Sequence, residues 1–117
     1  MSNFIIYHNP RCSKSRQTLS LLVEHGIDPQ IILYLDQPPK PKQLKTLLTQ
    51  LNIDARALLR KGEVDYKEQG LADKSLSDAH LIKTMCQFPK LIERPIVIKG
   101  NKAVLGRPPE NVLLLIK

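Results

Sequence analysis

The segment from His8 to Arg16 places one cysteine among cationic and polar residues. It reads His-Asn-Pro-Arg-Cys-Ser-Lys-Ser-Arg, with Cys12 between a short apolar run and a segment of helical character. A thiol at the start of a helix lies over free backbone N–H groups and the positive end of the helix dipole, which favour the nucleophilic thiolate. The same N–H groups can hold a tetrahedral oxyanion. The pattern therefore predicts nucleophilic chemistry on an anion.

The second cysteine has a different setting. Cys86 falls on an apolar stripe with Ile82 and Met85, in a segment of helical spacing. A cysteine there behaves as a small buried hydrophobe, so we assign Cys86 to the core and give it no chemical role. The three histidines do not cluster with the cysteines at ligand spacing, so no metal site is expected.

The chain has the length and composition of one globular domain. It contains 117 residues, of which 42% are hydrophobic and 25% charged, so we expect a single domain over residues 1–117. No apolar run approaches the roughly 20 residues that span a bilayer. The N-terminus lacks the basic and apolar regions of a secretory signal. With two cysteines, these features predict a cytoplasmic protein without membrane binding or a lasting disulfide.

The chain is basic, with a formal net charge of +7. An excess of this size raises nucleic acid as a partner. However, the chain has three tyrosines, two phenylalanines, no tryptophan and no long basic run. Its charges are spread along the sequence instead of forming one stripe. We therefore expect no nucleic-acid binding, and a basic pocket for a small anion explains part of the charge.

The N-terminal third has the pattern of a βαβ unit. Phe4–Tyr7 predicts a strand, residues 15–25 predict a helix, and Ile31–Leu35 predicts a second, parallel strand. The apolar face of the predicted helix consists of Leu19, Leu22 and Val23. Cys12 then lies at the C-terminal end of the first strand, which is the sheet edge where α/β proteins bind ligands.

The middle of the chain predicts helices. After a proline-rich break, the leucines at 44, 47, 48 and 51 follow helical spacing, and Ala55–Arg60 and residues 78–88 predict two further helices. Candidate N-cap residues are Asp54 for the first of these and Ser77 or Asp78 for the second. Residues 61–75 are polar and predict a loop with irregular helix.

The C-terminal part returns to strands. Ile96–Ile98 and Ala103–Leu105 flank Lys99–Lys102, whose Gly-Asn centre suits a tight hairpin turn. Residues 112–116 are apolar on all sides, so periodicity does not distinguish between two alternatives. The segment is either a final helix that begins after Pro108-Pro109 or a strand. The whole pattern is α/β: βαβ, a helical insertion, then ββα.

Three arginines stand at the ends of predicted elements. Arg60 closes the short helix, Arg94 precedes Pro95 and the third strand, and Arg107 follows the fourth strand. Guanidinium groups bind oxyanions through paired hydrogen bonds and remain charged. Each arginine alone could be a solvated surface residue. If the strands pair as expected, however, these ends converge on the Cys12 loop and predict an oxyanion site.

Together these residues resemble the arsenate reductases of the glutaredoxin-coupled class, which have a thioredoxin-like fold, and in particular their short branch. The resemblance covers essentially the whole chain. It is carried by Tyr-His-Asn-Pro-Arg-Cys at 7–12, Tyr-Leu at 34–35, Ala-Leu-Leu-Arg-Lys at 57–61, Gly-Leu-Ala at 70–72, Glu-Arg-Pro-Ile-Val at 93–97 and Gly-Arg-Pro at 106–108. It implies a thioredoxin-like mixed sheet. In such folds a cis-proline sits against the active-site cysteine, and Pro95 is the candidate here.

The resemblance also implies roles for single residues. Cys12 is the nucleophile, His8 helps to hold it as thiolate, and Ser15 can supply a hydroxyl to the sulfur. The arginines that would bind the oxyanion are Arg60, Arg94 and Arg107. Cys12 would attack arsenate to form a covalent adduct; glutathione then attacks, glutaredoxin takes over the glutathione moiety and arsenite leaves. No bound cofactor or metal is implied, since glutathione serves as a reducing cosubstrate.

Two alternatives remain open at this point. The basic cysteine loop and Glu93, a carboxylate next to Arg94, leave room for another oxyanion or a glutathionylated partner as substrate. Regulatory proteins of the Spx type share the fold but bind RNA polymerase. Spx-type proteins have a Cys-x-x-Cys redox switch near the N-terminus, in which the two cysteines form a disulfide. Here the second position is Ser15, so this loop cannot form that disulfide. The three arginines also favour the enzyme.

Overall fold

The computed structural model describes residues 3–116, and the chain divides into two compact units. The sheet unit is formed by the chain up to Gln37 and from Arg94 onward, and the helical unit is Pro38–Glu93. A single domain over residues 1–117 stays a prediction. No helix among the described residues is long and apolar enough to cross a membrane.

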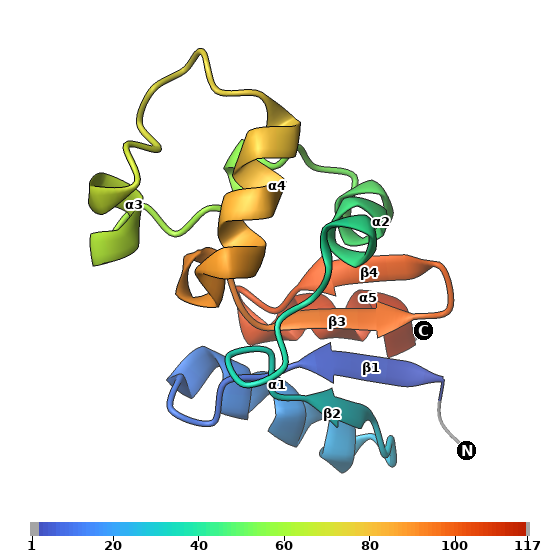
Figure 1. Cartoon of the computed structure of the whole chain (residues 1–117). Coiled ribbons are helices and arrows are strands. Elements are labelled where there is room, and N and C mark those ends of the chain that lie inside the picture. The colour runs from blue at the N-terminus through green and yellow to red at the C-terminus, as the bar shows by residue number, and fades with distance from the viewer. Residues whose placement is uncertain (1–2, 117) are drawn as a thin grey trace. The chain divides into compact units, whose positions relative to one another are not determined.

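The sheet unit contains a four-stranded sheet in the order β2-β1-β3-β4 (Figure 1). β1 (Phe4–Tyr7) runs parallel to β2 (Gln30–Ile32) and antiparallel to β3 (Ile96–Lys99). β3 pairs antiparallel with β4 (Lys102–Leu105). This mixed sheet, entered through a βαβ unit and closed by a hairpin, confirms the predicted α/β class and strand order along the chain.

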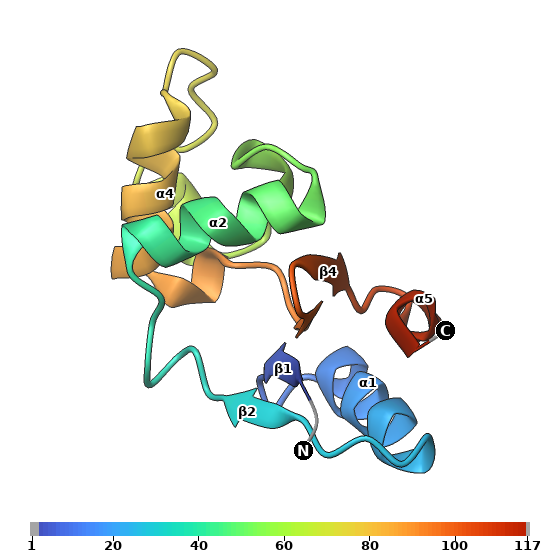
Figure 2. The same ribbon diagram turned by 90° about the vertical axis from the view of Figure 1, so that its right-hand side faces the viewer.

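Two helices, α1 (Ser13–Glu24) and α5 (Leu113–Ile116), lie on the same face of this sheet (Figure 2). Ile6 and Val97 are direct partners in the sheet, and alternate residues of a strand face the same side. They therefore form one apolar surface beneath the helices. The buried core on this face consists of Phe4, Ile6, Leu22, Val97, Val112 and Leu115.

The buried side of α1 differs from the predicted one. Val23 is 60% exposed, whereas Ser15, Thr18 and Leu22 are buried. Of the predicted apolar face, Leu22 is buried and Leu19 packs against the core as expected, and only Val23 was wrong. Ser15 and Thr18 were missed because they are polar and do not appear in an apolar pattern. Their hydroxyl groups are hydrogen-bonded inside the fold, which removes the main cost of burying them.

The second strand is shorter than predicted, since β2 ends at Ile32 instead of Leu35. After Ile32 the backbone turns, and the N–H groups of Asp36 and Gln37 both donate to the carbonyl of Leu33. A short apolar run does not reveal where a strand gives way to a turn.

The hairpin and the C-terminus follow the predictions. β3 and β4 are joined through Gly100, whose φ of 62° suits the first central position of a two-residue turn. At the C-terminus, Pro109–Val112 forms a 3-10 turn that continues into α5. The final segment is therefore a helix, and the strand alternative is excluded.

The helical unit is built from α2 (Pro41–Leu51), α3 (Val64–Glu68) and α4 (Asp78–Gln87). α2 packs against α4. The N-cap of α4 is Ser77, whose Oγ accepts a hydrogen bond from the His80 N–H at 3.2 Å. Of the two candidates, Ser77 and Asp78, the structure therefore confirms Ser77. The largest buried side chains in this unit include Leu44, Leu58, Leu71, Leu81, Met85 and Leu91.

The helix predicted over Ala55–Arg60 is wrong beyond its first turn. Asp54 Oδ1 accepts from the Ala57 N–H at 2.9 Å, but only Arg56–Leu58 forms a 3-10 turn. Leu59 is extended and forms an isolated antiparallel bridge with Ile92. Pairing with a distant segment has overridden the local helical preference.

Gly106, directly after β4, lies in close contact with α1 and Pro95. A Cβ built on Gly106 would lie 2.5 Å from Thr18 Oγ1 and 2.8 Å from Pro95 Cγ, so no other residue fits without a shift. The Gly106 N–H donates to the Pro95 carbonyl at 2.9 Å, and the Thr18 hydroxyl contacts the Gly106 carbonyl at 3.3 Å. This contact fixes the chain positions of Arg94 and Arg107 against α1.

We predict that Gly106→Ala destabilises the protein by about 1–3 kcal/mol, because overpacking forces side chains or backbone to move. Urea denaturation of wild type and variant measures the free energy of unfolding. Gly62→Ala is the matched control, since a Cβ there meets nothing within 4 Å, and it should stay within about 0.5 kcal/mol of wild type. Equal effects of the two substitutions would contradict the close-packing argument.

Candidate active site

Cys12 occupies the N-cap position of α1 in an extended conformation, with φ −96° and ψ 123°. Its N–H donates to the Asn9 carbonyl at 3.0 Å, and its carbonyl accepts from the Arg16 N–H at 3.0 Å in the first helical turn. The thiol makes no capping hydrogen bond. The sulfur therefore stands at the helix start, where free N–H groups are available to a charged ligand or a thiolate.

Asn9 organises the loop that carries the cysteine. Its carbonyl accepts from the Cys12 N–H, its N–H donates to Ser15 Oγ at 3.0 Å, and its Oδ1 accepts from the Arg11 N–H at 3.0 Å. Its side chain is buried. The sequence analysis did not single out Asn9, although an asparagine directly after a strand is typical of residues that hydrogen-bond to the backbone two positions on.

His8 and Ser15 form a buried pair beneath the loop. His8 Nδ1 lies 2.6 Å from Ser15 Oγ, and both side chains are buried. Burial and then the charge of Arg16 lower the pKa of His8, so its neutral form is favoured. The Ser15 hydroxyl contacts His8 and Asn9, while its backbone N–H faces the sulfur. A hydroxyl contact to the sulfur stays a prediction.

Arg94 and Arg107 lie beside Cys12. Arg107 Nη1 is 4.0 Å from Cys12 Sγ and donates to the Arg94 carbonyl at 3.1 Å. The Asn111 amide donates to the Arg107 carbonyl at 3.1 Å, which fixes the backbone of this arginine. Both Arg94–Pro95 and Arg107–Pro108 peptide bonds are cis. Two of the three predicted arginines therefore gather at the cysteine.

These surroundings favour the thiolate of Cys12. Burial by itself would raise the pKa of the thiol, but it is outweighed by the Ser15 N–H, the Arg94 guanidinium and the Lys14 N–H, so the pKa of Cys12 is lowered. Hydrogen bonds and opposite charge both stabilise the ionised form. The site thus combines a thiol whose ionised form is favoured with two cations and the helix N–H groups.

Cys86 is the contrasting thiol. It lies on α4, is partly exposed instead of fully buried as predicted, and is a free cysteine like Cys12. Burial raises the pKa of Cys86, with no cation opposing it. Partial exposure without an activating group leaves it as a weakly reactive thiol.

Arg60 belongs to the helical unit. Its Nε lies 3.3 Å from Glu63 Oε2, and its Nη1 pairs with Glu93 Oε1 at 2.5 Å. The convergence of Arg60 on the Cys12 loop stays a prediction. The sequence analysis noted Glu93 beside Arg94, but missed that both carboxylates pair with Arg60.

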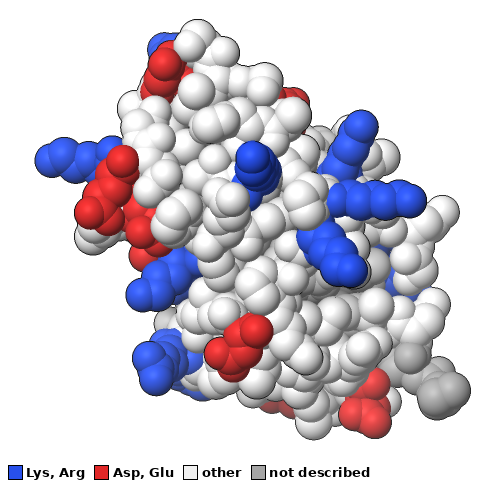
Figure 3. Space-filling view, viewed as in Figure 1, with Lys and Arg blue, Asp and Glu red and all other residues white. Residues whose placement is uncertain are grey.

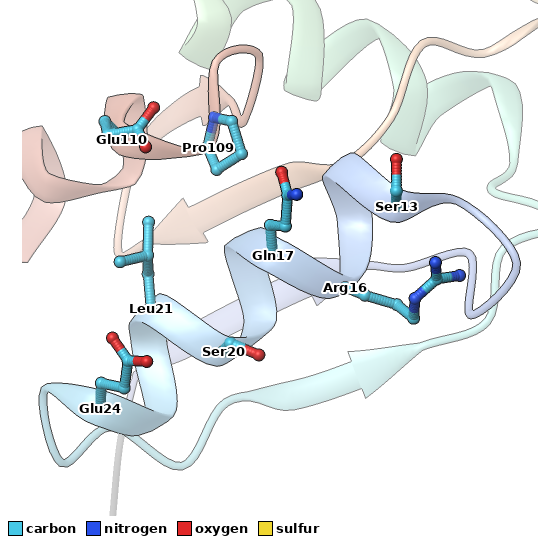
Figure 4. A pocket seen from close by; sticks show the side chains of 8 residues that line it. All are labelled: Ser13, Arg16, Gln17, Ser20, Leu21, Glu24, Pro109 and Glu110. Atoms are coloured by element: carbon cyan, nitrogen blue, oxygen red, sulfur yellow. The ribbon is translucent and has the colours of Figure 1, made fainter.

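A polar hollow of about 530 Å³ lies between α1 and the Pro109–Glu110 segment (Figure 4). It begins at Ser13, one residue beyond Cys12, and Arg16 is its one cation, set against Glu24 and Glu110. This lining does not favour anions. The residues suited to an oxyanion are instead those around the Cys12 sulfur.

Figure 3 shows how the charged side chains are distributed on one face of the molecule. On the face shown in Figure 3, lysine and arginine side chains stand in separate small groups. Within residues 3–116, no three His, Cys, Asp or Glu side chains are grouped so that they could hold a metal ion. The chemistry suggested by the described residues is therefore concentrated at Cys12.

The chain is similar to known proteins over nearly its whole length. The model of the ArsC family matches residues 7–115, and the chain therefore belongs to the ArsC family. It is 48% identical to an arsenate reductase of Haemophilus influenzae, over 96% of this chain and 97% of that protein. It is 54% identical to the uncharacterized Escherichia coli protein YfgD, over 95% and 94%.

A solved structure supports the same assignment. The chain is 52% identical to an arsenate reductase from Vibrio cholerae, with a TM-score of 0.93 and coverage of 95% of both chains. This likeness confirms the predicted thioredoxin-like fold and the family resemblance. The family model begins at Tyr7, so the matched region includes the whole Cys12 loop and both Arg-Pro steps.

We predict that the pKa of Cys12 lies below, and the pKa of Cys86 above, that of an ordinary cysteine, which is about 8.5. Iodoacetamide alkylation of Cys86→Ser, which retains Cys12, should have its pH midpoint below that value. The rate should fall as the pH drops through the lowered pKa, because the thiolate is protonated. Alkylation of Cys12→Ser, which retains Cys86, should have a midpoint above it. Coinciding midpoints would contradict the activated site.

We predict that Ser15→Ala destabilises the protein by about 1–3 kcal/mol, because it leaves the buried His8 Nδ1 and Asn9 N–H without their partner. Urea denaturation measures the loss. Ser20→Ala is the control on the same helix, since Ser20 is exposed, and it should change stability by less than about 0.5 kcal/mol. A Ser15→Ala protein as stable as this control would show that the buried pair is not structural.

Proposed function

We propose that this protein is a thiol-dependent arsenate reductase in which Cys12 is the nucleophile and glutathione and glutaredoxin supply the electrons. The observation that carries the proposal is the thiolate-favouring Cys12 at the start of α1, with Arg107 Nη1 4.0 Å away and Arg94 beside it. The arsenate reductases among its relatives support the choice of substrate. A cytoplasmic location, where thiols are kept reduced, fits this reaction.

The reaction begins with the Cys12 thiolate attacking the arsenic of arsenate. An As–S bond forms, and an arsenate oxygen leaves as water after protonation. Arg94, Arg107 and the N–H groups at the start of α1 stabilise the negative charge on the remaining oxygens. These donors are already in place before the oxyanion arrives, so little reorganisation accompanies the step.

The second stage needs a thiol from outside the chain. The glutathione thiolate attacks the arsenic of the Cys12 adduct, an As–S bond forms and a second oxygen leaves as water. A glutaredoxin thiolate then attacks the glutathione sulfur: a mixed disulfide forms, the bond between that sulfur and arsenic breaks, and its electron pair reduces arsenic to As(III). Water finally displaces the Cys12 sulfur, so that arsenite leaves and the Cys12 thiol is restored. Overall, two thiols lose two electrons and become a disulfide, arsenic passes from As(V) to As(III), and one oxygen is released as water. This balance requires neither a metal nor a bound cofactor.

The remaining predicted residues complete the site. His8 and Ser15 act as positioning residues, because their buried pair supports the turn that presents the Ser15 N–H to the sulfur. Arg60 is the third oxyanion-binding arginine, a role that rests on the family resemblance. Pro95, the cis-proline candidate, directly follows Arg94, and the Arg94–Pro95 peptide bond is cis.

We predict that Cys12→Ser abolishes arsenate reduction, because a hydroxyl of ordinary pKa cannot replace the thiolate. Cys86→Ser should retain nearly full activity. The measurement is arsenate-dependent turnover with glutathione, glutaredoxin and a regenerating system. Arg94→Ala and Arg107→Ala should each lower kcat/KM by about 10²-fold or more, whereas Lys83→Ala, on exposed surface of α4, should not.

Equal losses for the two cysteine variants would defeat the assignment of roles. Folded wild-type protein without turnover would remove arsenate from the proposal and favour another oxyanion or a glutathionylated protein. If that inactive protein also captured RNA polymerase subunits, the regulatory alternative would replace the enzyme.

A further inference from the structure

Arg60 is held by carboxylates on two sides. Glu63 contacts its Nε at 3.3 Å and Glu93 its Nη1 at 2.5 Å, and the three side chains are 22–26% exposed. Two carboxylates thus share one guanidinium group. Burial opposes the charge of Arg60, but Glu93 and then Glu63 outweigh it and raise the pKa of Arg60.

The backbone fixes this arrangement. The Arg60 N–H donates to the Leu91 carbonyl at 2.8 Å, and the Glu93 N–H donates to the Leu58 carbonyl at 2.9 Å, on either side of the Leu59–Ile92 bridge. Residues 60 and 93 thus lie on the same side of an antiparallel pair, close enough for long side chains to meet. Arg60 and Glu93 are therefore not a chance surface pair.

Glu63 is placed by the local chain. It is the N-cap residue of α3, and its N–H donates to the Arg60 carbonyl at 3.4 Å. Its carboxylate returns to the Nε of Arg60 across this turn. Arg60 therefore meets one carboxylate from its own turn and one from the paired segment.

A carboxylate and a tetrahedral oxyanion use the same donors of a guanidinium group. Nε and Nη1 of Arg60 already donate to carboxylates. An incoming oxyanion must either displace a carboxylate from these donors or use the remaining donors of Arg60 beside the two carboxylates, and like charges in contact oppose binding.

We propose that Glu93, assisted by Glu63, competes with the substrate oxyanion for Arg60 and so sets the affinity of the site. This inference rests on the proposed function, in which Arg60 binds the oxyanion. Glu93 is then a specificity-determining residue, because its ion pair with Arg60 both orders the arginine and weakens its binding of the anion.

The test compares Glu93→Gln and Glu63→Gln with wild type. Glutamine keeps the shape and one hydrogen bond but removes the competing charge. Titration calorimetry with arsenate and with phosphate should show a Kd lowered about three- to tenfold in Glu93→Gln and by a smaller factor in Glu63→Gln. In turnover, KM should fall by a similar factor with kcat within about twofold. Glu68→Gln, an exposed residue at the end of α3, is the matched control and should match wild type.

A double variant locates the effect. In the Arg60→Ala background, the further change Glu93→Gln should no longer strengthen anion binding, because the guanidinium group for which Glu93 and the anion compete is absent. A gain that persists without Arg60 would overturn the proposal. An unchanged or raised Kd in Glu93→Gln, with only a lower Tm, would also overturn it and leave the contact as a structural ion pair.

Failure of the proposed function would look different. Wild type that binds arsenate and phosphate in the calorimeter but does not reduce arsenate would refute the reductase activity. The calorimetric comparison of the variants would still decide the competition for Arg60.

Discussion

The close approach of Gly106 to Thr18 and Pro95 is the contact on which the geometry of the site depends. It joins α1 to the two ends of the β3–β4 hairpin, and it leaves no room for a Cβ. Arg94 directly precedes Pro95, and Arg107 directly follows Gly106. Two guanidinium groups close together repel each other, so their placement must be supported by packing and by backbone bonds. The Arg107–Arg94 carbonyl bond and the Asn111 amide supply part of that support.

The position of Cys12 links its ionisation to the start of α1. Side chains at the N-cap usually provide an oxygen that accepts from the first N–H groups of the helix. Cys12 makes no such hydrogen bond. Burial alone would raise the pKa of its thiol, but the N–H groups of Ser15 and Lys14, together with Arg94, lower it overall. The start of the helix therefore favours a negative charge at the sulfur, and an oxyanion that reacts there meets the same N–H groups.

Much of the sheet unit could be predicted from residue patterns, because its strands are short, apolar and bounded by clear turns. β1 was predicted with its observed ends, and Gly100-Asn101 marked the hairpin. The errors arose where distant segments meet. Leu59 forms a bridge with Ile92 instead of continuing a helix, and α1 buries Ser15 and Thr18 while Val23 is exposed.

The candidate site shows the same division. A cysteine and arginines at element ends could be recognised from residue type, because their chemistry is specific. Asn9 could not be recognised in this way, since its importance comes from three hydrogen bonds made within one loop. Glu63 meets Arg60 within one local turn, whereas the pairing of Glu93 with Arg60 depends on a backbone bridge between segments more than thirty residues apart, and no local pattern encodes that bridge.

The solitary thiol of the sheet unit also bears on the fate of the product. Trivalent arsenic is held most firmly when two or three sulfurs chelate it, since each additional ligand adds to the first without a new encounter. Position 15, one helical turn from Cys12, carries a hydroxyl, and the only other cysteine of the chain belongs to the helical unit. In the proposed reaction, the sheet unit offers arsenite a single sulfur ligand, that of Cys12. A site with one sulfur holds trivalent arsenic less firmly than a dithiol does, so release of the product would be easier.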